Sequence, residues 1–205
     1  MITIDPQAIS NIQNYKLVTG AVIPRPIAWV STLTDNGVLN IAPFSYFNIV
    51  ASDPPIVSVS VARREGQMKD TTRNAIASGE LVIHIVSEHL TEEMNHTGAT
   101  LPPEQSELEL TNLTTVPSDR VAVPGIREAL VRFECKLEQH IPIKNDAGDV
   151  SNDLLLARII CYHFDEKVVD AEKFYVHANE LKPVARIAGN EYARLTDPFV
   201  VERPL

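Results

Sequence analysis

Residues 24–34 read PRPIAWVSTLT and residues 38–50 read VLNIAPFSYFNIV, and the tripeptide Asp35-Asn36-Gly37 separates them. Both segments are apolar and rich in β-branched or aromatic residues, which favours extended backbone. A short turn of this composition between two such segments is typical of a β-hairpin. These residues therefore predict an antiparallel β-protein.

Further segments continue the strand pattern. IVSVSVA (56–62) alternates, so Val57, Val59 and Val61 are expected on the buried face. LVIHIVS (81–87) is apolar throughout and predicts a buried strand. ALVRFECKLEQHI (129–141) alternates strictly, which places Phe133 and Cys135 inside and Arg132, Glu134, Lys136 and Glu138 in water. DLLLARIICYHF (153–164) is apolar on both faces and predicts a central strand.

Helices are fewer and short. Asp70 is expected to be the N-cap of a helix with the sequence DTTRNAIAS, which Gly79 ends. A second short helix is expected from Thr91 to Gly98, and the polar segment 101–119 is expected to run over the surface. No repeat or linker interrupts the chain. The prediction is one domain, residues 1–205, mainly β with short helices in an antiparallel, barrel-like arrangement.

The composition excludes several classes of protein. The chain has 205 residues, and its 14 prolines against 8 glycines argue against a helical bundle and against a glycine-rich dinucleotide loop. A formal net charge of -9 argues against partners such as nucleic acid or an anionic membrane. The chain start lacks the pattern of a secretory signal, and Cys135 and Cys161 lie in apolar segments without metal or redox spacing. We therefore expect a reduced, cytoplasmic protein with no metal site.

One basic cluster stands out in this acidic chain. ARREGQMKDTTRN (62–74) carries Arg63, Arg64, Lys69 and Arg73 and ends at the expected helix start. A helix N-terminus has free N–H donors and a partial positive charge, which suit a phosphate group. Lys69 adds a full charge, and Thr71 and Thr72 add hydroxyl donors. The residues alone leave open a solvated basic loop before an ordinary capped helix.

A second segment, NIAPFSYFN (40–48), combines small polar and aromatic residues around Pro43. Such a segment can present backbone donors and acceptors beside a flat apolar surface, as a planar heterocycle requires. The other interpretation is a strand that bends at Pro43 and buries its aromatic residues in the core.

Taken together and in order, five motifs resemble those of the flavin reductase-like family, whose fold is the FMN-binding, Greek-key split β-barrel. They are RPIAWVST (25–32), NIAPFSYFN (40–48), DPP (53–55), KDTTRN (69–74) and PVARIAG (183–189) followed by Tyr192. The resemblance extends from Leu17 to Tyr192, and the segment 101–119 matches none of its motifs. A lid over the nicotinamide site is one hypothesis for that segment.

The resemblance implies a cofactor site. Residues expected around the flavin phosphate are Ser31, Thr32, Arg63, Lys69, Asp70 and Thr71. Residues expected along the ribityl chain and the ring are Ala42, Pro43, Phe44, Ser45 and Asn48. Arg186 and Tyr192 match the C-terminal motif, but no direct contact is assigned to them.

The resemblance also implies a function. It implies an oxidoreductase that binds FMN, or FAD with its adenylate in solvent, and accepts hydride from NADH or NADPH. Reduced flavin or electrons would then pass to a partner oxygenase or another acceptor. The alternative is an FMN-binding electron carrier, like a flavoredoxin, with little NAD(P)H activity. A homodimer with flavin near the interface is implied too. Because the flavin supplies the chemistry, no catalytic acid or base is named.

Other candidate groups have simpler interpretations. His89, Glu92, Glu93 and His96 read as a solvated helix face, because a metal site needs three or more suitably placed ligands. His177 is a candidate for a residue near the nicotinamide or flavin ring. Trp29 is expected to pack in the core near the flavin edge. Ser45 has no paired His and Asp, which argues against a hydrolase.

Overall fold

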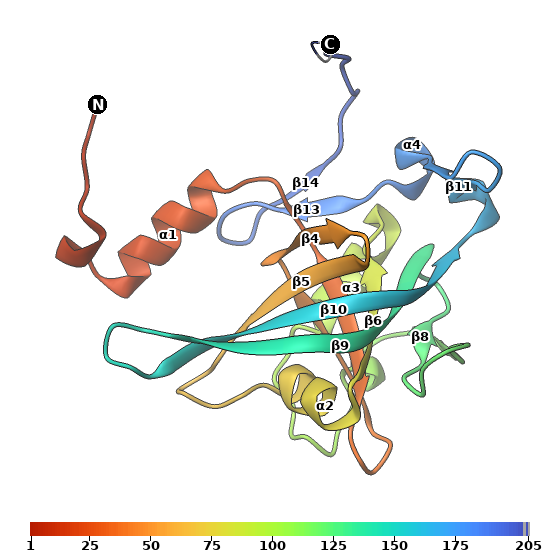
Figure 1. Cartoon of the computed structure of the whole chain (residues 1–205), viewed down its shortest axis with the longest axis horizontal. Helices are drawn as coiled ribbons and strands as arrows, with labels where there is room; N and C mark the ends of the chain where they lie inside the picture. Colours follow the sequence, from red (N-terminus) through yellow and green to blue (C-terminus); the bar gives the residue numbers. More distant parts are fainter. Residues whose placement is uncertain (203, 205) are drawn as a thin grey trace.

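The main sheet has seven antiparallel strands in the order β3-β2-β6-β9-β10-β5-β4 (Figure 1). This is seen in a computed structural model, which describes residues 1–202 and 204. The strands are β2 (Ala28–Leu33), β3 (Leu39–Phe44), β4 (Phe47–Ser52), β5 (Pro55–Ala62), β6 (Glu80–Ile85), β9 (Val131–Lys144) and β10 (Val150–Phe164). The mainly β, antiparallel architecture is confirmed.

The sheet curls into a barrel that is split between its two edge strands. β3 and β4 are consecutive in the chain, joined by Ser45 and Tyr46, yet they do not pair with each other. One hydrophobic cluster nevertheless joins side chains from both halves of the sheet. Its members include Ala28, Val30, Phe44, Val57, Val59, Val61, Leu81, Ile83, Cys135, Leu155, Ala157 and Ile159. This cluster is the barrel core.

A second cluster covers the outer face of β2. It contains Trp29, Ile41, Met94, Ile126 and Val184, from segments far apart in the sequence. The additional strands form a three-stranded sheet and two short ribbons. They are β1 (Arg25–Pro26), β13 (Val184–Arg186), β14 (Tyr192–Arg194), β7 (Thr115–Val116), β8 (Gly125–Ile126), β11 (Val169–Asp170) and β12 (Tyr175–Val176).

Four α-helices and four 3-10 turns complete the fold of the described residues. They are α1 (Asn11–Ala21), α2 (Asp70–Ser78), α3 (Thr91–His96), α4 (Ala178–Leu181), η1 (Pro6–Ala8), η2 (Glu88–Leu90), η3 (Glu107–Leu110) and η4 (Glu166–Val168). α2 packs on the barrel through Ala75, which belongs to the barrel core. α1 was not predicted, although Ser10 and Gln13 form a capping box at its start. In Figure 1 it lies beside the barrel rather than on it, and Thr19 is its single buried residue.

Most of the predicted elements are confirmed. Leu33 pairs with Leu39 across the predicted hairpin turn, in which Gly37 adopts a positive φ of 78°. Val57, Val59 and Val61 are buried, as their alternation indicated. β10 lies between β9 and β5 as an interior strand of the sheet.

Three predictions were wrong in detail. α2 begins at Asp70 with Lys69 as its N-cap, so Asp70 lies in the first turn, where it pairs with Arg73. Glu134 does not face water and is fully buried. The loop that covers it satisfies its carboxylate, because the backbone N–H groups of Asp119 and Arg120 donate to it. The segment 101–119 is not simply a surface excursion, since Glu107 is only 4% exposed.

Within the described residues, no helix has both the length and the apolar character needed to cross a membrane.

Candidate functional site

The start of α2 has no side-chain cap among the described residues. Its N-cap, Lys69, is extended and makes no side-chain capping hydrogen bond to the first turn. Asp70 does not supply that cap either, because its carboxylate pairs with Arg73. The first-turn N–H groups and the positive end of the helix dipole are therefore available to an anion.

Lys69 adds a cation that no carboxylate neutralises. It makes no ion pair within the described part of the chain, and its Nζ lies 5.8 Å from the centroid of the Phe44 ring. Desolvation lowers the pKa of Lys69, and repulsion from Arg64 lowers it further. An anion bound here would offset both effects, so the electrostatics favour a negatively charged ligand.

Neighbouring threonines in the first turn of α2 have different roles. Thr71 is buried, and its hydroxyl donates to Asn40 Oδ1 at 2.9 Å. Thr72 is fully buried as well, but its hydroxyl has no hydrogen-bond partner among the described residues. A buried hydroxyl without a partner is costly. Together with Lys69 and the open helix start, this hydroxyl fits a phosphate group.

A buried polar network fixes this helix start to β2 and β3. Glu107, from the segment 101–119, accepts hydrogen bonds from Asn40 Nδ2 and Ile41 N, both at 3.0 Å. Asn40 Oδ1 in turn accepts from Thr71 and, at 3.3 Å, from Thr32. Burial raises the pKa of Glu107, although the bonds from Ile41 and Asn40 oppose the shift. Sequence reasoning missed Glu107, because its partners are more than sixty residues away in the chain.

The ring-facing candidates lie on β3 and the turn that follows it. Ala42 and Pro43 are half-buried, and Phe44 is buried beneath Lys69. Ser45 Oγ lies 3.5 Å from Nε of Arg25. The structure therefore brings the end of β3 next to the start of α2.

Arg25 was not predicted to be part of this site, yet it holds three segments together. Its guanidinium is buried and donates to the carbonyl oxygens of Thr19, Val22 and Ile187 at 2.5–2.6 Å. The contact with Ser45 extends this arrangement to the turn after β3. The one sequence signal that could have identified Arg25 was its position at the start of the motif RPIAWVST (25–32). Arg25 acts by positioning its neighbours.

Three other candidates do not direct their side chains to the same point. Ser31 lies on the opposite face of β2 from Thr32, and its hydroxyl donates to the carbonyl of Pro124 at 2.9 Å. Arg63 forms a bidentate pair with the buried carboxylate of Asp153, with both N···O distances at 2.9 Å. Asn48 is exposed on the edge strand β4, and its Oδ1 accepts from Ile49 N.

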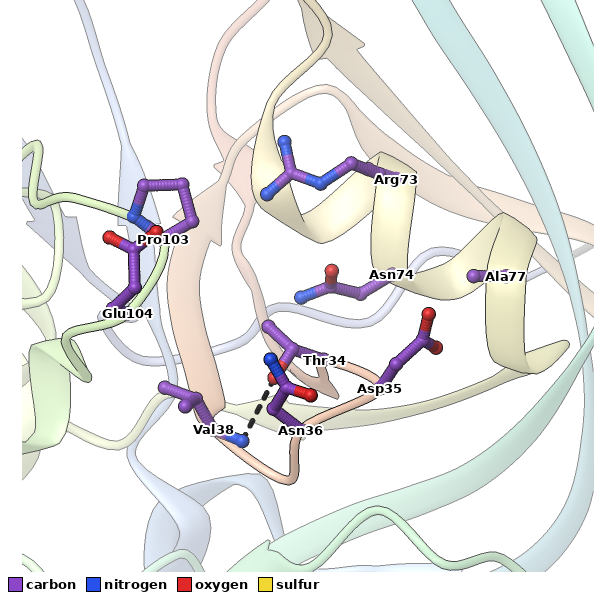
Figure 2. Close-up of a pocket in the computed structure, with 9 residues that line it drawn as sticks. All are labelled: Thr34, Asp35, Asn36, Val38, Arg73, Asn74, Ala77, Pro103 and Glu104. Atoms are coloured by element: carbon purple, nitrogen blue, oxygen red, sulfur yellow. Dashed lines mark hydrogen bonds between the residues drawn. The ribbon is translucent and has the colours of Figure 1, made fainter.

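A hollow of about 250 Å³ lies along the flank of α2 (Figure 2). Its wall joins the hairpin turn, where Val38 N donates to Thr34 Oγ1 at 2.9 Å, to residues of α2 and of the segment 101–119. Asp35, Glu104 and Arg73 line it, and it contains none of the predicted cofactor residues. The candidate cofactor residues gather instead around the helix start of α2 and the end of β3.

Further hollows lie beside α3 and the strands β13 and β14. Arg186 stacks its guanidinium 4.5 Å from the centroid of the Tyr192 ring, at the edge of a hollow of about 450 Å³. His96 also lines this hollow. Glu93, on the same helix, accepts hydrogen bonds from Asn112. His177 is exposed at the start of α4.

Comparison with known proteins identifies the family of the chain. The model of the "Flavin reductase like domain" family matches residues 19–183. The chain belongs to the flavin reductase-like family. Its fold is the split β-barrel of that family. The matched range includes the helix start of α2 and the end of β3.

Relatives are similar along nearly the whole chain. An uncharacterised Bacillus subtilis protein is 54% identical over 196 residues, which is 96% of each chain. The crystal structure of nitrilotriacetate monooxygenase component B from Bacillus cereus is 47% identical and superposes with a TM-score of 0.95, covering 98% of each chain. The 2-nitrobenzoate 2-nitroreductase of Pseudomonas fluorescens is 32% identical, with a TM-score of 0.89 over 99% of this chain and 96% of that one.

Proposed function

We propose that this flavin reductase-like protein binds FMN with its phosphate at the start of α2. The observation that carries the proposal is the combination of an unneutralised Lys69, an uncapped helix start and, within the described residues, the unpartnered hydroxyl of Thr72. Phosphate oxygens would satisfy all three. FAD is the alternative cofactor, since a phosphate at this point is common to both flavins.

The protein residues have binding and positioning roles in this proposal. Lys69 and Thr72 hold the phosphate, and Ala42, Pro43, Phe44 and Ser45 lie along the ribityl chain and the ring. Thr32 and Thr71 position the helix start through Asn40. Ser31 and Asn48 contribute through their main chain, and Arg63 and Asp70 shape the local charge.

The bound flavin supplies hydride-transfer chemistry, and the protein aligns it with a nicotinamide donor. We propose NADH or NADPH as that donor, and a partner oxygenase or another electron acceptor as the recipient of reduced flavin or electrons. The 47% identity to a protein named as a monooxygenase component supports this assignment. The alternative is an FMN-binding electron carrier without substantial NAD(P)H activity.

A second candidate function is reduction of a nitroaromatic compound. It is favoured by the 32% identity to a 2-nitrobenzoate 2-nitroreductase, which covers almost all of this chain. The same bound flavin would serve both reactions, so they differ in the acceptor rather than in the cofactor site.

We further propose a cytoplasmic homodimer. α1 has 11 residues, of which only Thr19 is buried, and a helix this short is marginal without a surface to pack on. Its exposed Ile12, Tyr15 and Val18, and the exposed Ile49 of edge strand β4, form apolar surface that a second copy would cover. The cysteines Cys135 and Cys161 are both free thiols, which agrees with a reducing compartment.

Anaerobic stopped-flow spectroscopy tests the function. Protein loaded with FMN, and separately with FAD, is mixed with NADH or NADPH, and the loss of oxidised flavin absorbance is followed. Rapid bleaching that saturates with the nucleotide supports a reductase; flavin that binds but bleaches no faster than free FMN supports the carrier. Adding 2-nitrobenzoate to the reduced protein then tests the nitroreductase reaction through the rate of flavin reoxidation. Absence of FMN and FAD binding at micromolar concentrations would contradict all of these functions.

A further inference from the structure

Glu134 is a buried carboxylate that the flavin site does not use. It lies on β9 directly opposite Cys161 of β10, and it is fully buried. Asp119 and His163 adjoin it. One ligand atom from each of Asp119, Glu134, Cys161 and His163 lies within 4.8 Å of every other. This cluster shares no residue with the proposed flavin site.

We propose that Asp119, Glu134, Cys161 and His163 form a structural Zn²⁺ site. The donors are a thiolate, an imidazole nitrogen and two carboxylates, which are the ligand types that zinc takes in proteins. Four protein ligands would fill a tetrahedral shell and leave no open position, as structural zinc sites require. The mixture of sulfur and nitrogen with oxygen disfavours Mg²⁺ and Ca²⁺.

The fold places the ligands before any metal binds. Cys161 and His163 are two residues apart on one strand, so their side chains leave the same face of β10. Glu134 is the register partner of Cys161 on β9. Asp119 lies in a loop, and its own backbone N–H donates to Glu134 Oε1 at 2.8 Å. Three separate segments thus converge on one point.

Zinc binding would need a local rearrangement of these side chains. His163 Nε2 and Glu134 Oε1 are 2.5 Å apart and form a hydrogen bond that the metal would replace. Ligand atoms of tetrahedral zinc are about 3.3–3.7 Å apart. This pair would therefore open by about 1 Å, and any pair near the 4.8 Å limit of the cluster would close by about 1 Å. Glu134 keeps the hydrogen bonds from Asp119 N and Arg120 N at 2.8 and 2.6 Å, which orient it as outer-shell donors do.

The surrounding charge is also suitable. Two carboxylates and a thiolate bring three negative charges, which the zinc ion and the nearby guanidinium of Arg132 would balance. Arg132 lies two residues from Glu134 on β9, and its Nε is buried without a hydrogen-bond partner among the described residues. The metal would fasten the end of the segment 101–119 to the outer face of β9 and β10.

The sequence did not suggest this site. Cys161 and His163 have ligand-compatible spacing on one strand, but Glu134 and Asp119 are brought to them by strand pairing and a loop. Alternation alone directed Glu134 to water, and the expectation was of no metal site.

The test is zinc binding by the purified full-length protein. The protein is equilibrated with Zn²⁺, dialysed against metal-free buffer and analysed for metal content and by zinc X-ray absorption. We expect one zinc per chain with a sulfur ligand at about 2.3 Å. Cys161→Ala and His163→Gln should each weaken zinc binding at least tenfold, whereas the matched control His177→Gln should bind zinc like the unaltered protein.

Several outcomes would overturn the proposal. They are no retained zinc in the unaltered protein, retained zinc without a sulfur ligand, or full zinc binding by both Cys161→Ala and His163→Gln. The X-ray absorption measurement needs no variant, so it tests the zinc site even if a substitution prevents folding. Flavin binding is measured on the same samples, and the conclusion about zinc does not depend on its presence or absence.

Discussion

Lys69 and Phe44 are in contact: the ammonium nitrogen lies 5.8 Å from the centroid of the aromatic ring. Lys69 is the N-cap of α2, and Phe44 ends β3. Their contact joins the helix start to the end of β3. In the proposed site, the phosphate of the flavin lies at the helix start and its ribityl chain and ring lie along the segment 42–45.

The two threonines of the first turn should respond differently to substitution. Thr72→Val removes a hydroxyl that has no partner among the described residues, so we expect FMN affinity to fall about tenfold with little loss of folding stability. Thr71→Val removes a bond to Asn40 and should lower the free energy of unfolding by about 1 kcal/mol. Flavin titration and urea unfolding separate the effects. The reverse pattern would remove the phosphate role from Thr72.

Glu107 should matter for stability although it lies in a loop. Glu107→Ala leaves Asn40 Nδ2 and Ile41 N without their acceptor in a buried setting, and each such loss costs about 1–3 kcal/mol. We expect a clear decrease in the midpoint of urea unfolding, together with weaker FMN binding, because the helix start is no longer fixed. The matched control is Glu109→Ala, at an exposed position two residues away. Equal effects of the two substitutions would contradict the network.

His84 should make stability depend on pH. It is fully buried, with Nδ1 bonded to Trp29 O and Nε2 accepting from Ile126 N, and burial lowers its pKa from 6.5 to about 4. The folded state therefore favours neutral His84. Its contribution is complete above pH 6.5 and is lost as pH falls toward 4, amounting to about 3 kcal/mol.

The check is urea unfolding from pH 7 to 4.5 for the unaltered protein, His84→Asn and the exposed control His177→Asn. The carboxylates with lowered pKa, Glu80, Glu134 and Asp153, start from ordinary values of 4.5 or less, below this pH range. Burial raises the pKa of Glu107, but this carboxylate is present in all three proteins, so it does not affect the comparison of slopes. We expect His84→Asn to flatten the slope and His177→Asn to keep it. An unchanged slope in His84→Asn would contradict the assignment.

The apolar surface of α1 and β4 should set the oligomeric state. Ile49 is 76% exposed on edge strand β4, so Ile49→Asp should shift a dimer toward monomer in light scattering coupled to gel filtration. Ile143→Asp, at an exposed apolar position in the β9–β10 hairpin, is the control and should leave the mass unchanged. A monomeric unaltered protein at micromolar concentration would contradict the proposed homodimer.

Local sequence signals were sufficient for most of the fold. The hairpin around Gly37, the alternation of Val57 to Val61 and the helix that Gly79 ends each depend on neighbouring residues, and each is present. Glu134 was misplaced because alternation assigns faces but cannot show that a loop fifteen residues away donates to the outer face.

The candidate site could be proposed from the sequence, but its residues could not be assigned separate roles. Lys69 and the helix start could be proposed because phosphate affinity at a helix N-terminus is a local property. Thr71 differs from Thr72 because its hydroxyl donates to Asn40. Arg63 is paired with Asp153, ninety residues away in the chain. Such tertiary partners leave no pattern in a single sequence.

The most direct test of the proposed flavin site compares FMN with riboflavin, which lacks the phosphate. Dissociation constants are measured by flavin fluorescence quenching for the unaltered protein, Lys69→Ala and the exposed control Lys144→Ala. Loss of a charged hydrogen bond of about 1.5–3 kcal/mol predicts that Lys69→Ala weakens FMN roughly 10- to 100-fold and leaves riboflavin within about twofold. Equal losses for both ligands, or no loss for FMN, would contradict a phosphate site at the start of α2.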